Sequence, residues 1–154
     1  MKKIRLIFSN SNKPLSPIIR VVTWSDYSHV AMLVDDDHII ESTLSHGGVR
    51  IETLDTFKSR ASNWLLVELD IEVNDWGAIL KAAYNELGKP YDFLGIAGIG
   101  IHRNWQEDDR WFCSELIPYI CMKGGTDLFN HAFVHRIVPQ YLLMLPSNVI
   151  DASY

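Results

Sequence analysis

Two apolar runs separated by three consecutive aspartates most tightly constrain how this chain can fold. Residues 29–34 and 38–42 are each about the length of a strand, and residues 35–37 are all aspartate. Extended apolar runs that flank a short polar break are typical of an antiparallel β-hairpin. The first part of the chain is therefore expected to contain a half-buried sheet.

The register of this hairpin decides which of its side chains share a face. If Val34 pairs with His38 across a three-residue turn, Ala31 faces Glu41. His29 and Glu41 are then diagonal neighbours on one face, with backbones about 7–8 Å apart, and a long side chain bridges that span. A two-residue turn would place them on opposite faces. The parity permits a His29–Glu41 pair but does not require it.

The pattern along the chain predicts strands early and helices late. Helix ends are indicated by Gly88 with Pro90, and by the glycine pair at residues 124–125. We expect residues 1–154 to form one α+β domain with mostly antiparallel strands. Strands are expected at about residues 4–8, 49–53 and 64–69, helices at about 16–22, 74–87, 93–101, 112–123 and 139–145, and an irregular tail after them.

Composition excludes several classes of function. Hydrophobic residues make up 47% and charged residues 21%, which is ordinary for a globular protein. A formal charge of −5 and the lack of a basic block argue against nucleic acid as a partner. No apolar stretch approaches the ~20 residues that span a bilayer, and no signal peptide is evident. We expect a cytoplasmic or otherwise soluble protein, and the residues carry no signal for its oligomeric state.

Cys113 lies where a polar segment gives way to an apolar helix. The free backbone N–H groups and the positive dipole end at a helix start both favour a thiolate, which is the reactive form of cysteine. Cys121 follows eight residues later in an apolar run and is expected to be an inert core residue. Pro118 lies beyond the first turn, so a kink or a delayed helix start is expected.

A cysteine nucleophile needs a base, a residue that orients the base, and donors for an oxyanion. His29 is the first choice of base, and Glu41 would accept its Nδ1–H so that Nε2 faces the sulfur. The backbone N–H of Cys113 is one natural oxyanion donor, and the hydroxyl of Tyr91 is a second candidate.

Two other histidines and a metal site are the alternatives to this assignment. His38 has the opposite parity to Glu41, and His46 lies beside a diglycine, so each is a second choice of base. Cys113, His29, His46 and Glu41 are all competent zinc ligands. No two of these four residues form a close pair at C-x-x-C or H-x-x-x-H spacing, and zinc sites usually have one.

Two short motifs resemble the NlpC-type cysteine peptidases. Residues 87–91, LGKPY, and residues 112–116, FCSEL, are similar to a glycine-x-proline-tyrosine segment and a cysteine-serine pair that opens the central helix of that family. Because His29 precedes the cysteine, the order resembles the circularly permuted, YiiX-like branch of papain-like hydrolases. Residues 138–142, VPQYL, are also similar to a stretch after its cysteine helix. The likeness spans about residues 18–145, and Phe112 stands where commoner members have aspartate.

The resemblance implies a papain-like fold in permuted order, with an antiparallel sheet or small barrel packed on helices. It implies cysteine-dependent hydrolysis or acyl transfer without a cofactor. Cys113 would be the nucleophile, His29 the base and Glu41 the orienting residue. An amide, first of all in a cell-wall peptide, is the leading substrate, and a lipid-linked ester or amide is the second because the branch includes acyltransferases. A binding or assembly module without turnover is the remaining alternative.

Overall fold

The computed structural model describes residues 2–12, 25–91, 111–129 and 137–153. Within these residues, six strands form one sheet in the order β4-β3-β2-β1-β5-β6, and every neighbouring pair is antiparallel. The expected α+β class with an antiparallel sheet is confirmed. The strands are β1 (Lys3–Asn10), β2 (His29–Leu33), β3 (His38–Thr43), β4 (Gly48–Thr53), β5 (Asn63–Glu72) and β6 (Ser147–Ala152).

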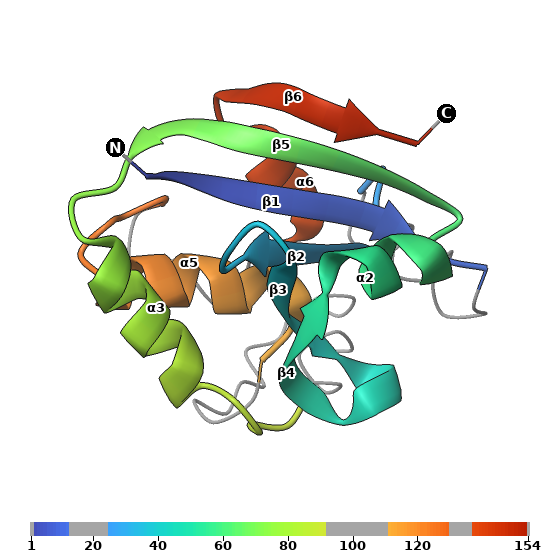
Figure 1. Cartoon of the computed structure of the whole chain (residues 1–154), viewed down its shortest axis with the longest axis horizontal. Helices are drawn as coiled ribbons and strands as arrows, with labels where there is room; N and C mark the ends of the chain where they lie inside the picture. The colour runs from blue at the N-terminus through green and yellow to red at the C-terminus, as the bar shows by residue number, and fades with distance from the viewer. Residues whose placement is uncertain (1, 13–24, 92–110, 130–136, 154) are drawn as a thin grey trace.

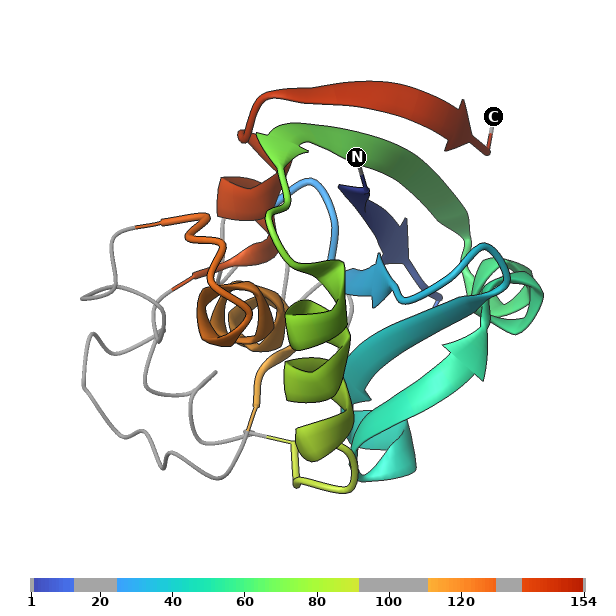
Figure 2. The ribbon, with the colours of Figure 1, turned by 60° about the vertical axis from the view of Figure 1, so that its left-hand side comes forward.

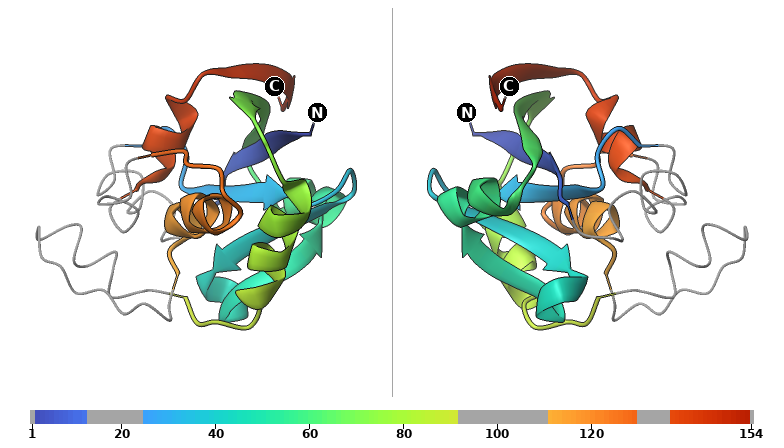
Figure 3. Two further views of the ribbon diagram at one scale, coloured as in Figure 1. Left: turned by 90° about the vertical axis from the view of Figure 1, so that its left-hand side faces the viewer. Right: turned by 90° about the vertical axis from the view of Figure 1, so that its right-hand side faces the viewer.

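The sheet is strongly curved, and helices lie on both of its sides (Figure 1). Helix α5 packs against β2, β3 and α3 on the inner side, whereas α2 lies across the sheet from them (Figures 2 and 3). The helices of the described residues are α2 (Leu54–Arg60), α3 (Trp76–Asn85), α5 (Cys113–Lys123) and α6 (Pro139–Leu143), with a 3-10 turn η1 (Leu44–His46) after β3.

Strand alternation divides the apolar side chains between two cores. The larger core lies between the sheet and α3, α5 and α6, and the smaller one lies under Phe57 of α2. Met32 and Ile40 belong to the first, whereas Leu33 and Ile39 belong to the second. Each fully buried side chain of this size stabilises the fold by about 1.5–3 kcal/mol. The sheet is therefore covered on both faces where β2 and β3 pair.

The hairpin adopts the register of a three-residue turn, the first of the two alternatives that the sequence left open. Met32 pairs with Ile40 and Leu33 with Ile39, and the Val34 N–H donates to the His38 carbonyl at 3.0 Å. The turn therefore contains three residues, as the parity argument required. This register puts the side chains of residues 29 and 41 on the face that α2 covers.

Several other expectations can be compared with the structure. The strand near residues 64–69 and the helices near 74–87, 112–123 and 139–145 are present with shifted ends. The prediction of an irregular tail is wrong, because residues 147–152 form β6 against β5. The prediction that the cysteine helix starts late is also wrong, since α5 begins at Cys113 and continues through Pro118. Helices α2 and η1 were not expected, and the predicted helices at 16–22 and 93–101 lie outside the described residues.

A glycine lets a loop approach the edge of β4. Gly48 has φ +143°, and a Cβ atom there would lie 2.0 Å from the Lys89 carbonyl oxygen. The Val49 N–H donates to that oxygen at 2.9 Å, and the Gly88 N–H donates to the Val49 carbonyl at 3.0 Å. These bonds hold the segment that ends at Tyr91 against the sheet, and Tyr91 in turn bridges to Trp111.

Candidate active site

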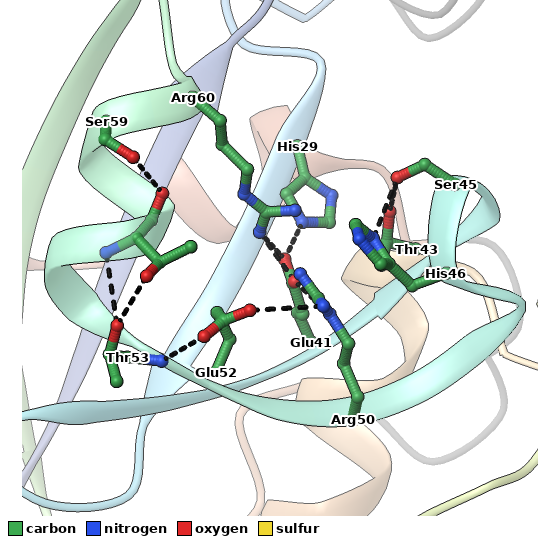
Figure 4. A network of polar contacts seen from close by, with 11 residues as sticks. His29, Glu41, Thr43, Ser45, His46, Arg50, Glu52, Thr53, Ser59 and Arg60 are labelled. Atoms are coloured by element: carbon green, nitrogen blue, oxygen red, sulfur yellow. Dashed lines mark hydrogen bonds and ion pairs between the residues drawn. The ribbon is translucent and has the colours of Figure 1, made fainter.

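His29 of β2 and Glu41 of β3 form a direct side-chain pair (Figure 4). His29 Nε2 lies 2.7 Å from Glu41 Oε2. The carboxylate is fully buried, whereas the imidazole is 20% exposed. The expected pair is therefore present, but the assignment of its nitrogens is wrong. Glu41 contacts Nε2 and not Nδ1.

Two arginines also contact the Glu41 carboxylate (Figure 4). Arg50 Nε donates to Oε1 at 3.0 Å, and Arg60 Nη2 lies 2.5 Å from both Oε1 and Oε2. Arg50 stands opposite Glu41 in the β3–β4 ladder, whereas Arg60 is the last residue of α2. Glu41 therefore joins three elements through charge-assisted hydrogen bonds, which are stronger than neutral ones.

These partners explain how a buried carboxyl group stays ionised. Burial by itself would raise the pKa of Glu41, but the hydrogen bond and charge of His29, followed by those of Arg60, lower it to about 2. The ordinary value is 4.5. An anion paired with cations in this way is favoured over the neutral acid despite its loss of water. Glu41 is therefore a carboxylate at neutral pH.

His29 lies between Glu41 and Cys113. Burial would lower the pKa of His29, but hydrogen bonds with Cys113 and Glu41, together with the charges of both, raise it from 6.5 to about 9. Because Nε2 is engaged by Glu41, Nδ1 is the ring nitrogen left for Cys113. The ring also stacks on Phe57, with centroids 5.7 Å apart and planes inclined by 24°. The imidazole is thus held by contacts at both of its ends and on one face.

Cys113 is the first residue of α5 and is 1% exposed. Phe112 precedes it as the N-cap, in extended conformation and without a side-chain cap. The first backbone N–H groups of a helix have no partners within the helix and carry the positive end of its dipole. The sulfur therefore lies at an electropositive helix start, beside a histidine from β2.

Hydrogen bonds fix the chain on either side of Cys113. Ser42, next to Glu41 on β3, donates from Oγ to the Trp111 carbonyl at 2.6 Å. Ser114 donates from Oγ to the Ile137 carbonyl. Both serines are fully buried. The position of the cysteine is thus tied to β3 and to the segment before α6.

Tyr91 lies close to this helix start. It forms a parallel bridge with Trp111, and its ring meets that of Phe112 edge-on at a centroid distance of 6.0 Å. Phe112 is fully buried in this contact. The ring of Tyr91 is therefore in contact with the residue before Cys113, and its function as an oxyanion donor stays a prediction.

The other histidines and the other cysteine considered from the sequence have different neighbours. His38 contacts Asp35 at 3.0 Å, and 46% of its side chain is exposed. His46 is exposed on η1 and contacts the Ser45 hydroxyl at 3.1 Å. Cys121 is buried near the other end of α5, where loss of solvent raises the pKa of its thiol to about 12. Of the two thiols, Cys113 is the one that the structure places with His29 and Glu41.

A family model described as permuted papain-like amidase enzyme, YaeF/YiiX, C92 family, matches residues 3–127. The chain belongs to this family. The expected permuted papain-like hydrolase fold is therefore confirmed. Among solved structures, the chain is similar to the metalloprotein yiiX from Escherichia coli O157:H7, with 20% identity and a TM-score of 0.76 over 99% of this chain and 98% of that one. No curated protein matches.

The solved structure to which this chain is similar is called a metalloprotein. The described residues of this chain contain no group of three histidine, cysteine, aspartate or glutamate side chains that could hold a metal ion. Both oxygens of Glu41 already accept from guanidinium groups, whose charge repels a cation. The described residues of this C92-family chain therefore do not fit a metal at Glu41. Nor do they include a helix long and apolar enough to cross a membrane.

Sequence reasoning missed Arg50, Arg60 and Ser42. A signal for Arg50 was available, because the glycine turn at residues 47–48 aligns β4 so that Arg50 pairs with Glu41. Ser42 has the opposite parity to Glu41 and therefore faces α5. No local pattern pointed to Arg60, which reaches Glu41 through a short helix that was not expected.

Proposed function

We propose that this chain is a cysteine-dependent amidase in which Cys113 is the nucleophile, His29 the general base and acid, and Glu41 the residue that orients His29. The observation that carries the proposal is the chain of contacts from Cys113 through His29 to the buried Glu41 carboxylate. Three separate elements supply these groups. This is the set of groups that thiol acyl transfer requires.

Acylation would begin with transfer of the Cys113 thiol proton to His29. The thiolate attacks the carbonyl carbon of the amide, and the carbonyl oxygen becomes an oxyanion in a tetrahedral intermediate. When this intermediate collapses, the C–N bond breaks, and His29 donates its proton to the leaving nitrogen. The products of the step are an amine and a thioester on Cys113. Glu41 stabilises the imidazolium throughout and holds the ring in place.

Deacylation would use the same groups in reverse. His29, now neutral, removes a proton from water as the water oxygen attacks the thioester carbon. The second tetrahedral intermediate collapses with cleavage of the C–S bond. The acid leaves, and the thiolate on Cys113 is restored beside a protonated His29. An alcohol or amine in place of water would make the reaction an acyl transfer.

The oxyanion would form at the start of α5. The backbone N–H of Cys113 and the helix dipole favour negative charge there, and one such donor is worth roughly 10²–10³ in rate. The Tyr91 hydroxyl is the proposed second donor, because its ring contacts Phe112 directly before the nucleophile.

The family name and the thiol–imidazole pair favour an amide as the bond that is cleaved, and we propose a cell-wall peptide as the first substrate to try. A panel of peptide amides, lipid amides and lipid esters would be incubated with wild-type protein and analysed by intact mass. We expect a mass increase equal to one acyl group, mapped to Cys113, and release of amine from the peptide amides.

The matched controls are two alanine variants of the same helix. Cys113→Ala should abolish the adduct and reduce turnover at least 10³-fold. Cys121→Ala should retain both within about twofold. An adduct formed only with lipid substrates would replace the peptide by a lipid as the substrate. Equal loss in both variants, or no adduct with any substrate, would contradict the proposed nucleophile.

A further inference from the structure

Arg60 reaches the candidate site from α2. His29 and Cys113 come from two other elements, β2 and α5. Its Nη2 lies 2.5 Å from both oxygens of Glu41, including Oε2, the atom that contacts His29. One guanidinium nitrogen therefore bridges the carboxylate on the side of the histidine (Figure 4). A bridging cation restricts rotation of the carboxylate about its Cγ–Cδ bond.

Helix α2 holds this guanidinium in a defined place. The helix begins after Thr53, whose Oγ1 accepts from the Thr56 N–H at 3.2 Å. Phe57 and Arg60 are three residues apart, so they share a face of the helix. The guanidinium carbon of Arg60 lies 5.1 Å from the centroid of the Phe57 ring. Because His29 stacks on the same ring, Phe57 contacts both the base and the cation that holds its partner.

Arg50 offers a matched comparison on the same carboxylate. Its Nε contacts Oε1, the oxygen away from His29, at 3.0 Å. Its Nη1 also lies 3.1 Å from Glu52 Oε2, so its charge is shared between two acids. Both arginine side chains are about one quarter exposed. The two residues therefore differ in that Arg60 contacts Oε2 as well as Oε1, whereas Arg50 contacts Oε1 and shares its charge with Glu52.

We propose that Arg60 is a positioning residue that fixes the Glu41 carboxylate against His29 and keeps it ionised. The proposal rests on the proposed function, since it assigns Arg60 to the support of the Cys113–His29 pair. Arg60 itself touches no reacting atom. If its contribution were only to stability, its removal would lower the melting temperature and leave the pH dependence of Cys113 reactivity unchanged.

The charged groups around Glu41 set the direction of the pH effect. They are His29 from β2, Arg50 and Glu52 from β4, and Arg60 from α2, with Cys113 of α5 reached through His29. Loss of Arg60 removes a cation, so the pKa of Glu41 rises from about 2 towards its ordinary 4.5. Near pH 4–5 a fraction of Glu41 then becomes neutral and holds His29 Nε2 less firmly, so the imidazolium is less well placed beside Cys113 and alkylation slows.

The test measures alkylation of Cys113 by iodoacetamide between pH 3.5 and 8, with Cys121 as the internal reference. In Arg60→Met the rise of the Cys113 alkylation rate with pH should occur about one pH unit higher than in the wild type. Alkylation at pH 4.5 should then be about tenfold slower. Arg60→Lys, which keeps the charge, should recover more than half of the shift. Arg50→Met should show less than half of it. Melting temperatures are recorded for each variant, and Arg60→Gln replaces Arg60→Met if the latter does not fold.

A profile of Arg60→Met that superimposes on the wild type would overturn the proposal, as would equal shifts in Arg50→Met and Arg60→Met. In both cases a fast-reacting wild-type Cys113 would leave the proposed function standing. A wild-type Cys113 that reacts no faster than Cys121 would overturn both proposals together.

Discussion

The two ends of helix α5 carry two cysteines that are equally buried and differently accompanied. Cys113 and Cys121 are 1% and 0% exposed, and they lie eight positions apart along one helix. Near its C-terminal end, Cys121 lies in the apolar core, and burial raises the pKa of its thiol to about 12. At the N-terminal end, Cys113 contacts His29, whose other ring nitrogen is held by Glu41.

Burial by itself raises the pKa of a thiol, as at Cys121, because the thiolate loses its water without a replacement. What distinguishes Cys113 is a partner supplied by another part of the fold. That partner in turn contacts the ionised carboxylate of Glu41 on β3. The difference between the two thiols therefore arises from the sheet rather than from the helix that carries both.

Removal of the partner should produce the largest effect. In His29→Ala, alkylation of Cys113 by iodoacetamide at pH 6 should slow by about 10²-fold and approach the rate of Cys121, since the imidazolium that stabilises the thiolate is lost. Peptide mapping by mass spectrometry after timed quenching measures both sites in one sample. An unchanged rate at Cys113 would show that the helix start alone accounts for its reactivity.

A change of pH should produce an intermediate effect with a defined sign. The pKa of His29 is raised from 6.5 to about 9, so the imidazolium that protonates the leaving group is lost as the pH rises through about 9. Amide hydrolysis should be half-maximal near pH 9 and fall about tenfold per pH unit above it, whereas alkylation of Cys113 should not fall. Hydrolysis that declines already near pH 6.5 would contradict the ion pair.

The same shift has a consequence for stability. Because the folded-state pKa of His29 is raised, its stabilising contribution is fully present below about pH 6.5 and is lost as the pH rises through about 9. Urea unfolding should therefore show that the free energy of unfolding falls more between pH 6 and pH 10 in the wild type than in His29→Gln.

Replacement of the inert thiol should produce the smallest effect. Cys121→Ala should leave alkylation of Cys113 and hydrolysis within about twofold of the wild type. It should lower the free energy of unfolding by about 1 kcal/mol, as expected when a buried group the size of a methylene is removed. Urea unfolding measures this difference. A tenfold loss of Cys113 reactivity in this variant would mean that the two ends of α5 are coupled.

Part of the site could be predicted because it depends on local periodicity. The three-aspartate turn fixes the parity of β2 and β3, and this parity brings His29 near Glu41. The nitrogen that meets the carboxylate could not be predicted, because it depends on the rotation of the ring and on its stacking against Phe57. Arg60 could not be predicted either, since its contact with Glu41 requires the packing of a seven-residue helix against the sheet.

The fold was predicted best where apolar alternation is strong. The strand β6 was missed because its residues are mostly exposed at the edge of the sheet, where burial imposes no alternation. Its place is set by hydrogen bonds to β5, and a sequence pattern does not reveal those partners.

The adjacent residues Glu41 and Ser42 make two contacts of the site depend on the same strand register. Glu41 holds His29 on one face of β3, and Ser42 holds the Trp111 carbonyl, two residues before the nucleophile, on the other. A slip of β3 by one residue would exchange these faces and release both attachments at once. A chain whose sheet has formed out of alignment therefore lacks both the His29–Glu41 contact and the Ser42–Trp111 contact, and the two contacts form together with the native pairing.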